Sequence, residues 1–456
     1  MPPSDWIIEK LVPGGEGMAR LADGRVGFAW GVVPGDKIRP EILEERSSFL
    51  RAKRHLLVEA GRDRVQAPCA VHGRCGGCDW MQLAPEQQRH AKLSLVREAL
   101  LRTGGFTPAT LPKLELERAG SDLGYRARVQ LQVGPRGEIG FFAARTHELV
   151  EISSCVVCDP RLQPLFTCLR ETGTAAEWAQ FERLELRVAD AAPYLLVRAQ
   201  PRLPRSRNRR AAAARAAKLE PLFARLASKL LAAGVTLVLA GSDRDSTLDQ
   251  RWELADDLFL AAPAAAFTQV NWSVNRALIE RVVQGASQRG LSRFLDLYCG
   301  AGNFSFPLAR AGLSGVGVEV SRGAIQAAER NLAALRSRAS ALQSAQAPAW
   351  ELRFVAGDVG PGLQELGDSR GFDLVLLDPP RSGAAAILPQ IAERLGAGAG
   401  PSPRYLCMCS CDPVTLARDL KQLTTLGFLI EELRAFDMFP HTHHVELLAW
   451  LVAPAA

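Results

Sequence analysis

Five short apolar segments in the last third of the chain constrain its fold more than any other feature. They are RFLDLY, GVGVEV, ELRFVAG, FDLVLLD and RYLCMCS, which span residues 293–298, 315–320, 351–357, 372–378 and 404–410. Helical stretches separate several of them, and buried strands that alternate with helices are typical of a doubly wound parallel sheet. We therefore expect a Rossmann-like α/β domain over residues 261–456 of a multidomain chain.

Flanking segments complete this expected domain. A helix within FTQVNWSVNRALIERVVQGA is expected to be capped by Asn271 or Ser273. At the other end, FLIEELRA (428–435) and VELLAWLV (445–452) are expected to form an antiparallel pair of strands at the edge of the sheet.

The loop after the first of these strands has the features of a cofactor site. The strand runs into Asp296 and then into a short glycine loop, DLYCGAGNFS, in which Gly300 and Gly302 let the backbone approach a ligand closely. Ligands of such sheets bind outside the carboxyl ends of the strands, where this loop begins. Ser305 occupies the place of the third glycine of a nicotinamide-binding loop, so the sequence disfavours NAD.

Acidic residues also follow the next three strands. Glu319 lies at the end of the second strand, where a carboxylate is well placed to accept both ribose hydroxyls. Asp358 follows the third strand and Asp378 ends the fourth. Single acids of this kind often cap helices, but a series of them beside a glycine loop suits a cofactor with positive charge and no pyrophosphate. The sequence therefore predicts S-adenosyl-L-methionine as the cofactor.

Three cysteines alternate along the fifth strand, and only the last of them reaches its carboxyl end. Cys407, Cys409 and Cys411 share one face of a strand at this spacing, and we interpret the first two as core residues. Asp412 and Pro413 then supply the N-cap and the first residue of a helix. Because a helix N-terminus lowers the pKa of a nearby thiol, we expect Cys411 to be a nucleophile with a lowered pKa.

A nucleophilic thiol beside S-adenosyl-L-methionine indicates methylation of carbon 5 of a pyrimidine. That carbon attacks a methyl group only after a thiolate has added to carbon 6, and a base must then remove the proton from carbon 5. Glu446, on the last predicted strand, is the candidate base. His441, His443 and His444 look like a metal-binding tract, but nothing nearby completes it and we expect no metal there.

The first part of the chain is richer in short strands. Residues 1–60 show strands between glycine turns, which predicts a small OB-like β-barrel. Residues 61–260 are expected to form a β-rich α+β domain, with a helix that ends at Gly104. One strand of that domain has a polar face that either contacts RNA or forms the solvated side of a sheet, and its polar residues are Arg126, Arg128, Gln130 and Gln132.

Charge and cysteine content limit the class of protein. The net charge of +6 is compatible with a nucleic-acid partner, and residues 191–219 hold eight basic residues and no acid. That segment is either a solvated, partly disordered insertion or a contact with nucleic acid. No apolar run reaches the roughly 18–20 residues of a membrane span, so no membrane partner is expected. Ten cysteines without an export signal predict reduced thiols and a cytoplasmic location.

Three of those cysteines, Cys69, Cys75 and Cys78, lie close together in the glycine-rich stretch CAVHGRCGGC. Close thiols in a reducing compartment bind a metal more often than they form disulfides. A fourth ligand has to come from elsewhere in the chain. Four thiolates suit zinc or an iron–sulfur cluster, and the spacing alone favours structural zinc slightly.

These motifs together resemble the bacterial RNA uracil-5-methyltransferase family, specifically its iron–sulfur 23S rRNA branch. SCDP is similar to the catalytic SCNP of the family, DMFPHTHHVE to its terminal base motif, and DLYCGAGNFS and LLDPPR to its cofactor loops. The resemblance covers almost the whole chain. It implies a TRAM barrel over residues 1–60, an iron–sulfur-bearing RNA-binding domain over 61–260 and a class I methyltransferase domain over 261–456. Asp412 departs from the family's asparagine and could raise the pKa of Cys411.

The resemblance also implies roles for individual residues. It implies Cys411 as nucleophile and Glu446 as base. It implies a [4Fe-4S] cluster that takes no part in redox chemistry, held by the three close cysteines and Cys155, with Cys158 as a rival ligand three residues further on. The implied contacts with S-adenosyl-L-methionine are Gln269, Tyr298, Gly300, Gly302, Asn303, Glu319, Asp358 and Asp378.

The implied substrate is 23S rRNA, and no DNA partner is expected. One alternative is the T-loop uridine of tRNA, although the bacterial tRNA members of the family usually lack the barrel and the cluster. Another is an iron–sulfur protein that binds RNA or senses redox state without catalysis, against which the complete set of catalytic and cofactor residues argues. Amino-methyltransferases also contain a DPP motif, but they need an aromatic residue after the prolines and no thiol.

Overall fold

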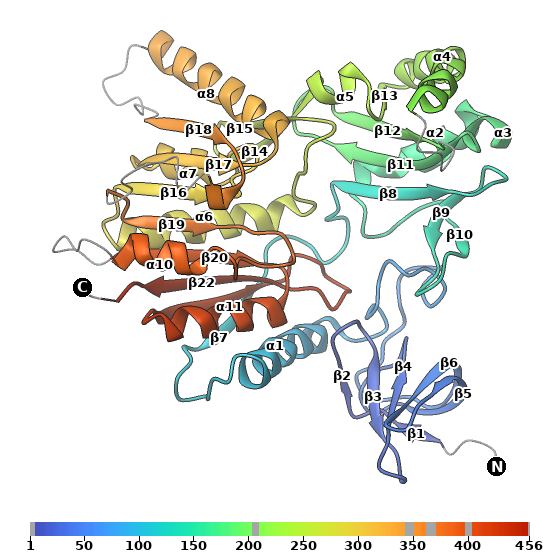
Figure 1. The fold of residues 1–456 in the computed structure, drawn as a ribbon. Helices are drawn as coiled ribbons and strands as arrows, with labels where there is room; N and C mark the ends of the chain where they lie inside the picture. The colour runs from blue at the N-terminus through green and yellow to red at the C-terminus, as the bar shows by residue number, and fades with distance from the viewer. Residues whose placement is uncertain (1–4, 203–208, 343–350, 362–370, 397–403, 455–456) are drawn as a thin grey trace.

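The computed structural model describes residues 5–202, 209–342, 351–361, 371–396 and 404–454. These residues form three sheets of six, six and eight strands and one separate hairpin. In Figure 1 the N-terminal sheet lies at the lower right, the central sheet at the upper right and the C-terminal sheet on the left. The predicted mixed α/β class is therefore confirmed, as a fold with several sheets.

The N-terminal sheet has the strand order β1-β5-β6-β4-β3-β2. Its strands are β1 (Trp6–Ile7), β2 (Lys10–Leu11), β3 (Gly17–Arg20), β4 (Val26–Ala29), β5 (Lys37–Glu45) and β6 (Phe49–Glu59). The expected turns are present, since Gly24 and Gly35 both have positive φ, the conformation that glycine adopts without strain. A small core of its own, which includes Trp6, Ile8 and Ile38, holds this sheet together.

The chain then passes through the cysteine-rich stretch into two elements that lie against the C-terminal sheet. Helix α1 (Pro85–Arg102) ends just before Gly104, as predicted, and packs on α11 (Pro413–Thr425). Strand β7 (Leu114–Glu117) pairs in parallel with β21 (Leu429–Phe436). The N-terminal half of the sequence therefore contributes a strand to the C-terminal sheet.

The central sheet has the order β10-β9-β8-β11-β12-β13. Its strands are β8 (Arg128–Val133), β9 (Ile139–Phe142), β10 (Leu149–Glu151), β11 (Phe181–Val188), β12 (Leu195–Pro201) and β13 (Val235–Leu239). The helices of this region are η1 (Pro160–Leu162), α2 (Gln163–Thr172), α3 (Ala175–Trp178), α4 (Arg209–Ala232) and α5 (Asp243–Thr247). The predicted alternation is confirmed, because Val129, Leu131 and Val133 are buried while Gln130 is exposed.

The basic segment of residues 191–219 is only partly visible. Arg198 lies on β12, and its guanidinium pairs with the carboxylate of Asp245. Residues 203–208 lie outside the described part of the chain, as do the side chains of residues 209–218.

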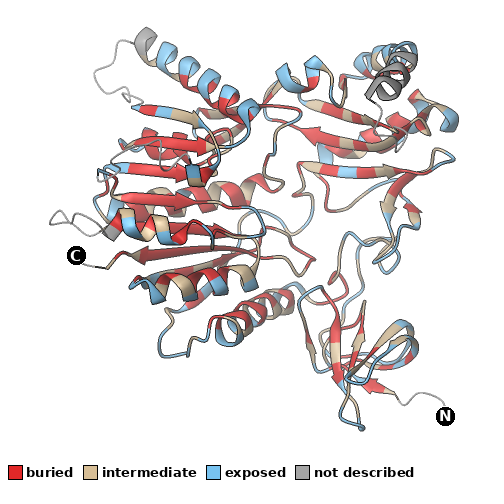
Figure 2. Ribbon diagram, in the orientation of Figure 1, coloured by how far each residue is buried: buried red, intermediate tan, exposed pale blue. Residues whose placement is uncertain are grey.

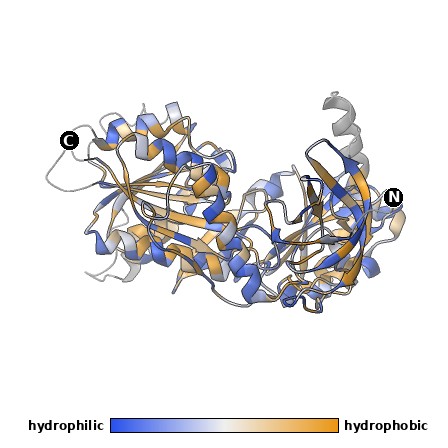
Figure 3. Ribbon diagram, turned by 90° about the horizontal axis from the view of Figure 1, so that it is seen from below, coloured by the Kyte–Doolittle hydropathy of each residue, from blue (hydrophilic) through white to orange (hydrophobic). Residues whose placement is uncertain are grey.

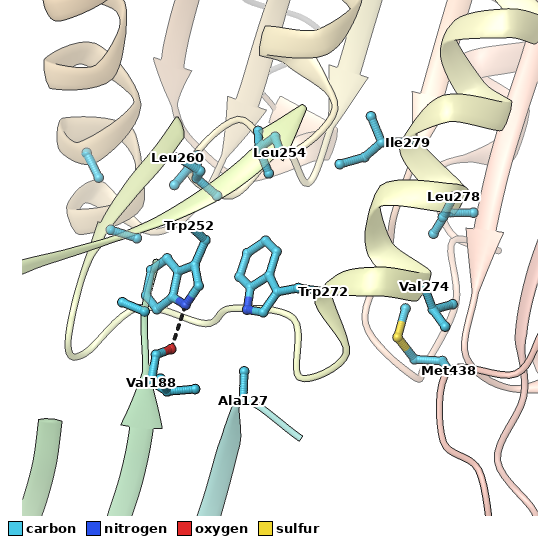
Figure 4. Close-up of a cluster of buried hydrophobic side chains, with 14 of the residues drawn as sticks. Ala127, Val188, Trp252, Leu254, Leu260, Trp272, Val274, Leu278, Ile279 and Met438 are labelled. Carbon is cyan, nitrogen blue, oxygen red and sulfur yellow. Dashed lines mark hydrogen bonds between the residues drawn. The ribbon is translucent and has the colours of Figure 1, made fainter. Parts of the chain in front are cut away.

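A hairpin joins the central and C-terminal sheets. It consists of β14 (Asp249–Ala255) and β15 (Leu258–Pro263). Trp252 of the hairpin stacks on Trp272 at the start of α6 (Trp272–Gln288), with ring centroids 5.4 Å apart, and its indole N–H donates to the carbonyl of Val188 at 2.9 Å (Figure 4). Buried residues from both sheets belong to one continuous core around this contact.

The C-terminal sheet has the order β18-β17-β16-β19-β20-β22-β21-β7. Its remaining strands are β16 (Arg293–Leu297), β17 (Ser314–Glu319), β18 (Leu352–Ala356), β19 (Leu374–Leu377), β20 (Tyr405–Ser410) and β22 (Glu446–Val452), and its remaining helices are α7 (Ser305–Arg310), α8 (Arg322–Leu342) and α10 (Leu388–Gly396). The five strands predicted from the apolar segments are present and parallel, and Asn271 caps α6.

One prediction for this sheet is wrong in part. β21 and β22 do pair antiparallel, but they do not form the edge of the sheet. β22 lies between β20 and β21, and β7 forms the edge beyond β21. All residues of β20 and most of β22 are buried (Figure 2). Both strands lie inside the sheet and are covered on both faces, which explains their continuous apolar sequences.

Hydrophobic residues follow the strands of the C-terminal sheet on the left of Figure 3, which views the molecule from below. No helix within the described ranges is both long enough and apolar enough to cross a membrane.

Candidate active site

The carboxyl ends of β16, β17 and β19 meet where the strand order reverses, which is the usual ligand site of a doubly wound sheet. The loop after β16 turns sharply there, with positive φ at Tyr298 (65°), Gly300 (56°) and Gly302 (100°). Positive φ is unusual for tyrosine and strains the backbone. The hydrogen bond from the Tyr298 N–H to the carbonyl of Val318 helps to stabilise this conformation. The loop is thus fixed in a shape that an ordinary turn would not adopt.

Buried carboxyl groups surround this loop. One oxygen of Asp296 accepts a hydrogen bond from the Ser305 hydroxyl at 2.5 Å, whereas its other oxygen has no partner. Burial raises the pKa of Asp296 to about 7, with smaller contributions from Asp378 and Glu319, and burial raises the pKa of Asp378 to about 6. Like charges gathered in a buried place are unfavourable without a cation, so the cluster is suited to a positively charged ligand.

Two other residues predicted to bind the cofactor are hydrogen-bonded to neighbouring residues of the protein. Glu319 accepts hydrogen bonds from the N–H groups of Gly300 and Ser321 at 3.3 and 2.7 Å. Asn303 exchanges two side-chain hydrogen bonds with Asn275 of α6.

Three predicted contacts remain, of which Tyr298 and Asp358 lie near each other. Asp358 is exposed after β18 and acts on Tyr298, whose pKa is raised by burial and by that carboxylate. Gln269 is half-buried in the loop between β15 and α6.

The pairing of β20 with β22 brings the predicted nucleophile and base to the same place. Ser410 pairs with Leu447 in this antiparallel register, so the next residues, Cys411 and Glu446, stand opposite each other. Glu446 also pairs with Phe436 of β21, which keeps it inside the sheet. Cys407 and Cys409 are fully buried, as the interpretation of these two cysteines as core residues requires.

The electrostatic environment of the thiol differs from the prediction. Burial raises the pKa of Cys411, and the neighbouring Glu446 raises it further, so the expected lowering by the helix N-terminus is wrong. Asp412 does cap α11, since its carboxylate accepts from the Thr415 N–H at 2.8 Å. Burial also raises the pKa of Glu446, and Asp378 adds to that effect.

Sequence reasoning missed Arg381. Its side chain is hydrogen-bonded to Cys411, and its positive charge lowers the pKa values of both Cys411 and Glu446, against the effect of burial. The hydroxyl of Thr415 donates to the Arg381 carbonyl at 3.1 Å and so ties this residue to the first turn of α11. The only sequence signal was its place at the end of LLDPPR, directly after a predicted cofactor motif.

The residues between β21 and β22, which we call the base loop (437–445), contain the histidine tract. His441 and Thr442 are buried, and burial lowers the pKa of His444 to about 4, with His443 and Arg381 adding to the effect. Within the described part of the chain, no three His, Cys, Asp or Glu side chains are grouped around a single ion, here or elsewhere.

The cysteines of the N-terminal half line a separate cavity of about 210 Å³. Its wall includes Cys69, Cys75, Cys78 and Cys155, which come from two segments far apart in the sequence. Apolar side chains and the guanidinium of Arg126 complete the wall. Cys158 is not part of the wall; it is buried and its thiol is hydrogen-bonded to that of Cys155. The four cysteines therefore lie together on the wall of one cavity.

Known proteins resemble this chain over most of its length. The profile of the tRNA (uracil-5-)-methyltransferase family matches residues 243–453. The chain is 32% identical to a Pseudomonas putida protein named 23S rRNA (uracil(1939)-C(5))-methyltransferase RlmD, with 97% of this chain and 92% of that protein covered. It is 31% identical to an uncharacterized RNA methyltransferase of Gloeobacter violaceus, with 97% and 95% covered.

The fold has a counterpart among solved structures. It matches the tRNA (uracil-54, C5)-methyltransferase of Pyrococcus abyssi, solved with S-adenosyl-L-homocysteine, with a TM-score of 0.68 and 22% identity. The match covers 98% of this chain and 100% of that chain.

Proposed function

This chain belongs to the RNA uracil-5-methyltransferase family, and from that premise we propose that it methylates carbon 5 of a uridine in 23S rRNA with S-adenosyl-L-methionine as methyl donor. The observation that carries the proposal is the β20–β22 register, which sets Cys411 opposite Glu446. A carbon-5 methylation needs one nucleophile and one base on the same pyrimidine, and this pair supplies both.

In the proposed reaction the Cys411 thiolate forms a bond to carbon 6 of the uracil. Arg381, hydrogen-bonded to the thiol, stabilises the thiolate against the burial that opposes it. After carbon 5 has taken the methyl group, the Glu446 carboxylate removes the proton from carbon 5. The electron pair of the broken carbon–hydrogen bond restores the double bond between carbons 5 and 6, while the carbon–sulfur bond breaks and its electron pair stays on sulfur, which regenerates the thiolate.

The raised pKa of Glu446 suits this role. A carboxylate buried beside another acid holds a proton more tightly than a solvated one, and is therefore a stronger base once it is ionised. The proposal also assigns the removal of the proton to a residue at the start of β22 whose backbone pairs with Phe436 of β21, which limits its movement.

The acid cluster around the β16 loop fits the methyl donor. S-adenosyl-L-methionine supplies an activated methyl group on a cationic sulfonium. The unpartnered oxygen of Asp296 and the raised pKa values of Asp296 and Asp378 are the features expected of an acidic site without its cation. Gly300 leaves open space where a side chain would begin, and Val320 is exposed directly after Glu319. We propose contacts from Gln269, Tyr298, Gly300, Gly302, Asn303, Glu319, Asp358 and Asp378.

The cysteine cavity fits a [4Fe-4S] cluster held by Cys69, Cys75, Cys78 and Cys155. A zinc ion needs all four sulfurs within about 2.3 Å of one point, whereas a cluster needs them spread around a larger body. The presence of these four cysteines on the wall of one cavity of about 210 Å³ supports the cluster, and the place of Cys158 outside the wall supports Cys155 as the fourth ligand. Iron and acid-labile sulfide measured on protein purified without oxygen test this assignment.

RNA binding is proposed for the N-terminal sheet, as a TRAM barrel, and for the polar face of the central sheet. Arg128 lies on β8, on the polar side of the sheet that also includes the exposed Gln130. The guanidinium of Arg128 lies 5.2 Å from the ring of Phe267, which is 71% exposed and lies two residues before Gln269. The basic face thus continues into the loop that we assign to the cofactor site.

The experiment that tests the function is 5-methyluridine mapping, by mass spectrometry, of rRNA and tRNA from cells that lack the gene. Loss of one 23S rRNA methyl group, restored by the wild-type gene but not by the Cys411→Ala variant, supports the proposal. Loss at the tRNA T-loop instead would keep the mechanism and replace the substrate. Unchanged rRNA and tRNA would leave a non-catalytic RNA-binding role. Ten free cysteines agree with a reducing compartment, so we propose that the reaction takes place in the cytoplasm.

A further inference from the structure

The base loop is held in place almost entirely by residues from the N-terminal half of the chain. Four consecutive carbonyls, those of Met438, Phe439, Pro440 and His441, each accept a hydrogen bond from outside the loop. The donors are, in the same order, the Asn271 amide, the Lys92 ammonium, the Tyr125 hydroxyl and the Trp80 N–H, at 3.2, 2.9, 3.1 and 3.0 Å. Three of these four donors precede residue 126. The loop that leads into Glu446 is therefore shaped by a distant part of the sequence.

The centre of this loop is strained. His441 has φ of 65°, a conformation that costs a histidine free energy unless the surroundings enforce it, and it is only 5% exposed. Gln88 of α1 enforces it, because its side-chain oxygen accepts from the His441 N–H at 2.9 Å. Lys92, one turn further along α1, also forms a buried ion pair with Asp437 at 2.5 Å. Without these partners nothing described here would stabilise the strained conformation of the loop.

Asp79 makes the contact nearest to Glu446 in sequence. One oxygen of its carboxylate accepts from the His443 N–H at 3.2 Å and lies 2.6 Å from the His443 ring nitrogen Nδ1. The other oxygen lies 3.5 Å from the indole N–H of Trp30 in the N-terminal sheet. Gly15 packs so closely on this carboxylate that a Cβ there would come within 2.7 Å of it. The carboxylate of Asp79 is thus fixed by Trp30 and Gly15 on one side, and on the other side it binds His443 of the base loop.

We propose that Asp79 is a positioning residue for Glu446: through His443 it sets where the base lies, and so controls removal of the carbon-5 proton rather than methyl transfer. The inference rests on the proposed function, because it assigns Glu446 to that step. Cys411 and the cofactor loop have no contact with residues 79–92 among the bonds described above. A displaced base loop would therefore leave thiol addition and methyl transfer in place and slow the release of product.

Asp79 also follows Cys78 directly, so the contact of Asp79 with His443 links the cysteine cavity to the base loop. The cavity lies in the N-terminal half of the chain, yet the residue next to its third cysteine bonds to the base loop. We therefore expect the state of the cavity to affect the release step first.

The test separates methyl transfer from release. The full-length, cluster-loaded protein is mixed with unmodified 23S rRNA transcribed in vitro and with methyl-labelled S-adenosyl-L-methionine in a single turnover. Total label in RNA reports methyl transfer, and label that migrates with the protein in a denaturing gel reports the methylated adduct. The variants are Asp79→Asn, which keeps the size of the side chain, Gln88→Leu, which removes an independent contact with the same loop, and Glu446→Gln.

Glu86→Gln on α1 is the matched control. Glu86 is an exposed carboxylate that pairs with Arg89 and does not bond to the base loop. Circular dichroism and thermal unfolding establish that each variant is folded before it is compared.

We expect Glu446→Gln to accumulate the methylated adduct. We expect Asp79→Asn and Gln88→Leu to transfer the methyl group at close to the wild-type rate and to release product roughly 10- to 100-fold more slowly, which is the usual effect of misplacing a catalytic group by about 1 Å. Glu86→Gln should behave as wild type. Wild-type release by both Asp79→Asn and Gln88→Leu, or equal slowing of transfer and release, overturns the inference while Glu446→Gln still traps the adduct. Absence of a trapped adduct in Glu446→Gln overturns the proposed mechanism itself, and the inference with it.

Discussion

We propose functions for two sets of thiols in this molecule, and the surroundings of the two sets differ. Cys411 stands alone at a strand end, with a cation, Arg381, hydrogen-bonded to it and a carboxylate, Glu446, opposite. Cys69, Cys75, Cys78 and Cys155 face one another across a largely apolar cavity. A single thiol between opposite charges is arranged to react, whereas several thiols around a space are arranged to bind. The same chemical group therefore acquires its role from its neighbours, not from its own burial, which raises the pKa of both Cys411 and Cys78.

The largest expected effect comes from removal of the single thiol, Cys411. Cys411→Ala should lower methyl transfer by roughly 10⁴-fold or more, because a lost covalent nucleophile has no substitute in the site. Cys409→Ala is the matched control, since this thiol lies on the same strand and is fully buried. It should keep the rate and lose only stability, by about 1 kcal/mol. Single-turnover assays and thermal unfolding measure the two effects, and equal rates for both variants would contradict the role of Cys411.

The second prediction separates two neighbouring cysteines of the other set. Cys155→Ser should lose most of the bound iron and several kcal/mol of stability, because a cluster ligand contributes its binding free energy to folding. Cys158→Ser should keep the iron, because this thiol is outside the cavity wall. Iron content and the urea midpoint of unfolding measure the difference. Iron retained by Cys155→Ser and lost by Cys158→Ser would exchange the two assignments.

The third prediction concerns the acid cluster, which has no equivalent at the cysteine cavity. The carboxyl groups of Asp296 and Asp378, with pKa values of about 7 and about 6, are ionised above these values and protonated below them. Only the ionised forms attract a cationic cofactor. Binding of S-adenosyl-L-methionine should therefore weaken roughly 10- to 100-fold as pH falls from about 8 to about 5. Calorimetric titration measures this dependence.

The control for the pH experiment is Asp296→Asn, which should bind more weakly at high pH and show a smaller dependence on pH. Affinity that stays constant over this range in the wild type would show that the cluster does not act on the cofactor.

The last prediction compares the two glycines of the loop after β16. Gly300→Ala should cost about 1 kcal/mol of cofactor binding or stability, because its φ of 56° is strained for alanine while the added Cβ meets no atom within 4 Å. Gly302→Ala should cost roughly 2–3 kcal/mol, because its Cβ would also lie 2.5 Å from the Phe306 ring. Thermal unfolding with and without cofactor measures both. Equal costs would show that the contact with Phe306 relaxes freely.

The sequence predicted the C-terminal sheet well because its signals are local. Apolar strands, glycine turns and the cap at Asn271 each depend on residues within one segment, and the structure has them at the predicted places. The place of β22 inside the sheet depends on its pairing with β20, which is not its neighbour in the sequence, and the addition of β7 depends on pairing between residues more than 300 positions apart, such as Leu114 with Leu433. No periodicity in one strand reports which distant strand it will join.

The candidate site shows the same division. Positions at strand ends, such as Cys411 and Glu319, follow from local patterns. The pKa of Cys411 was mispredicted because a helix N-terminus is visible in the sequence, whereas burial and a carboxylate on a neighbouring strand are not. Asp79 and Gln88 carry no chemical motif at all, and only the folded chain shows that they hold the base loop.

The position of β22 has a consequence for synthesis of the chain. This strand is the only link between β20 and β21 in the sheet, and β7 joins the sheet only through β21. A growing chain that stops before Glu446 therefore holds Cys411, the proposed nucleophile, without the proposed base, and its β7–β21 pair has no strand that joins it to β20. Cys411 and Glu446 are brought together only when this last strand is inserted between β20 and β21, so the strand that completes the sheet also supplies the group that we propose releases the methylated RNA.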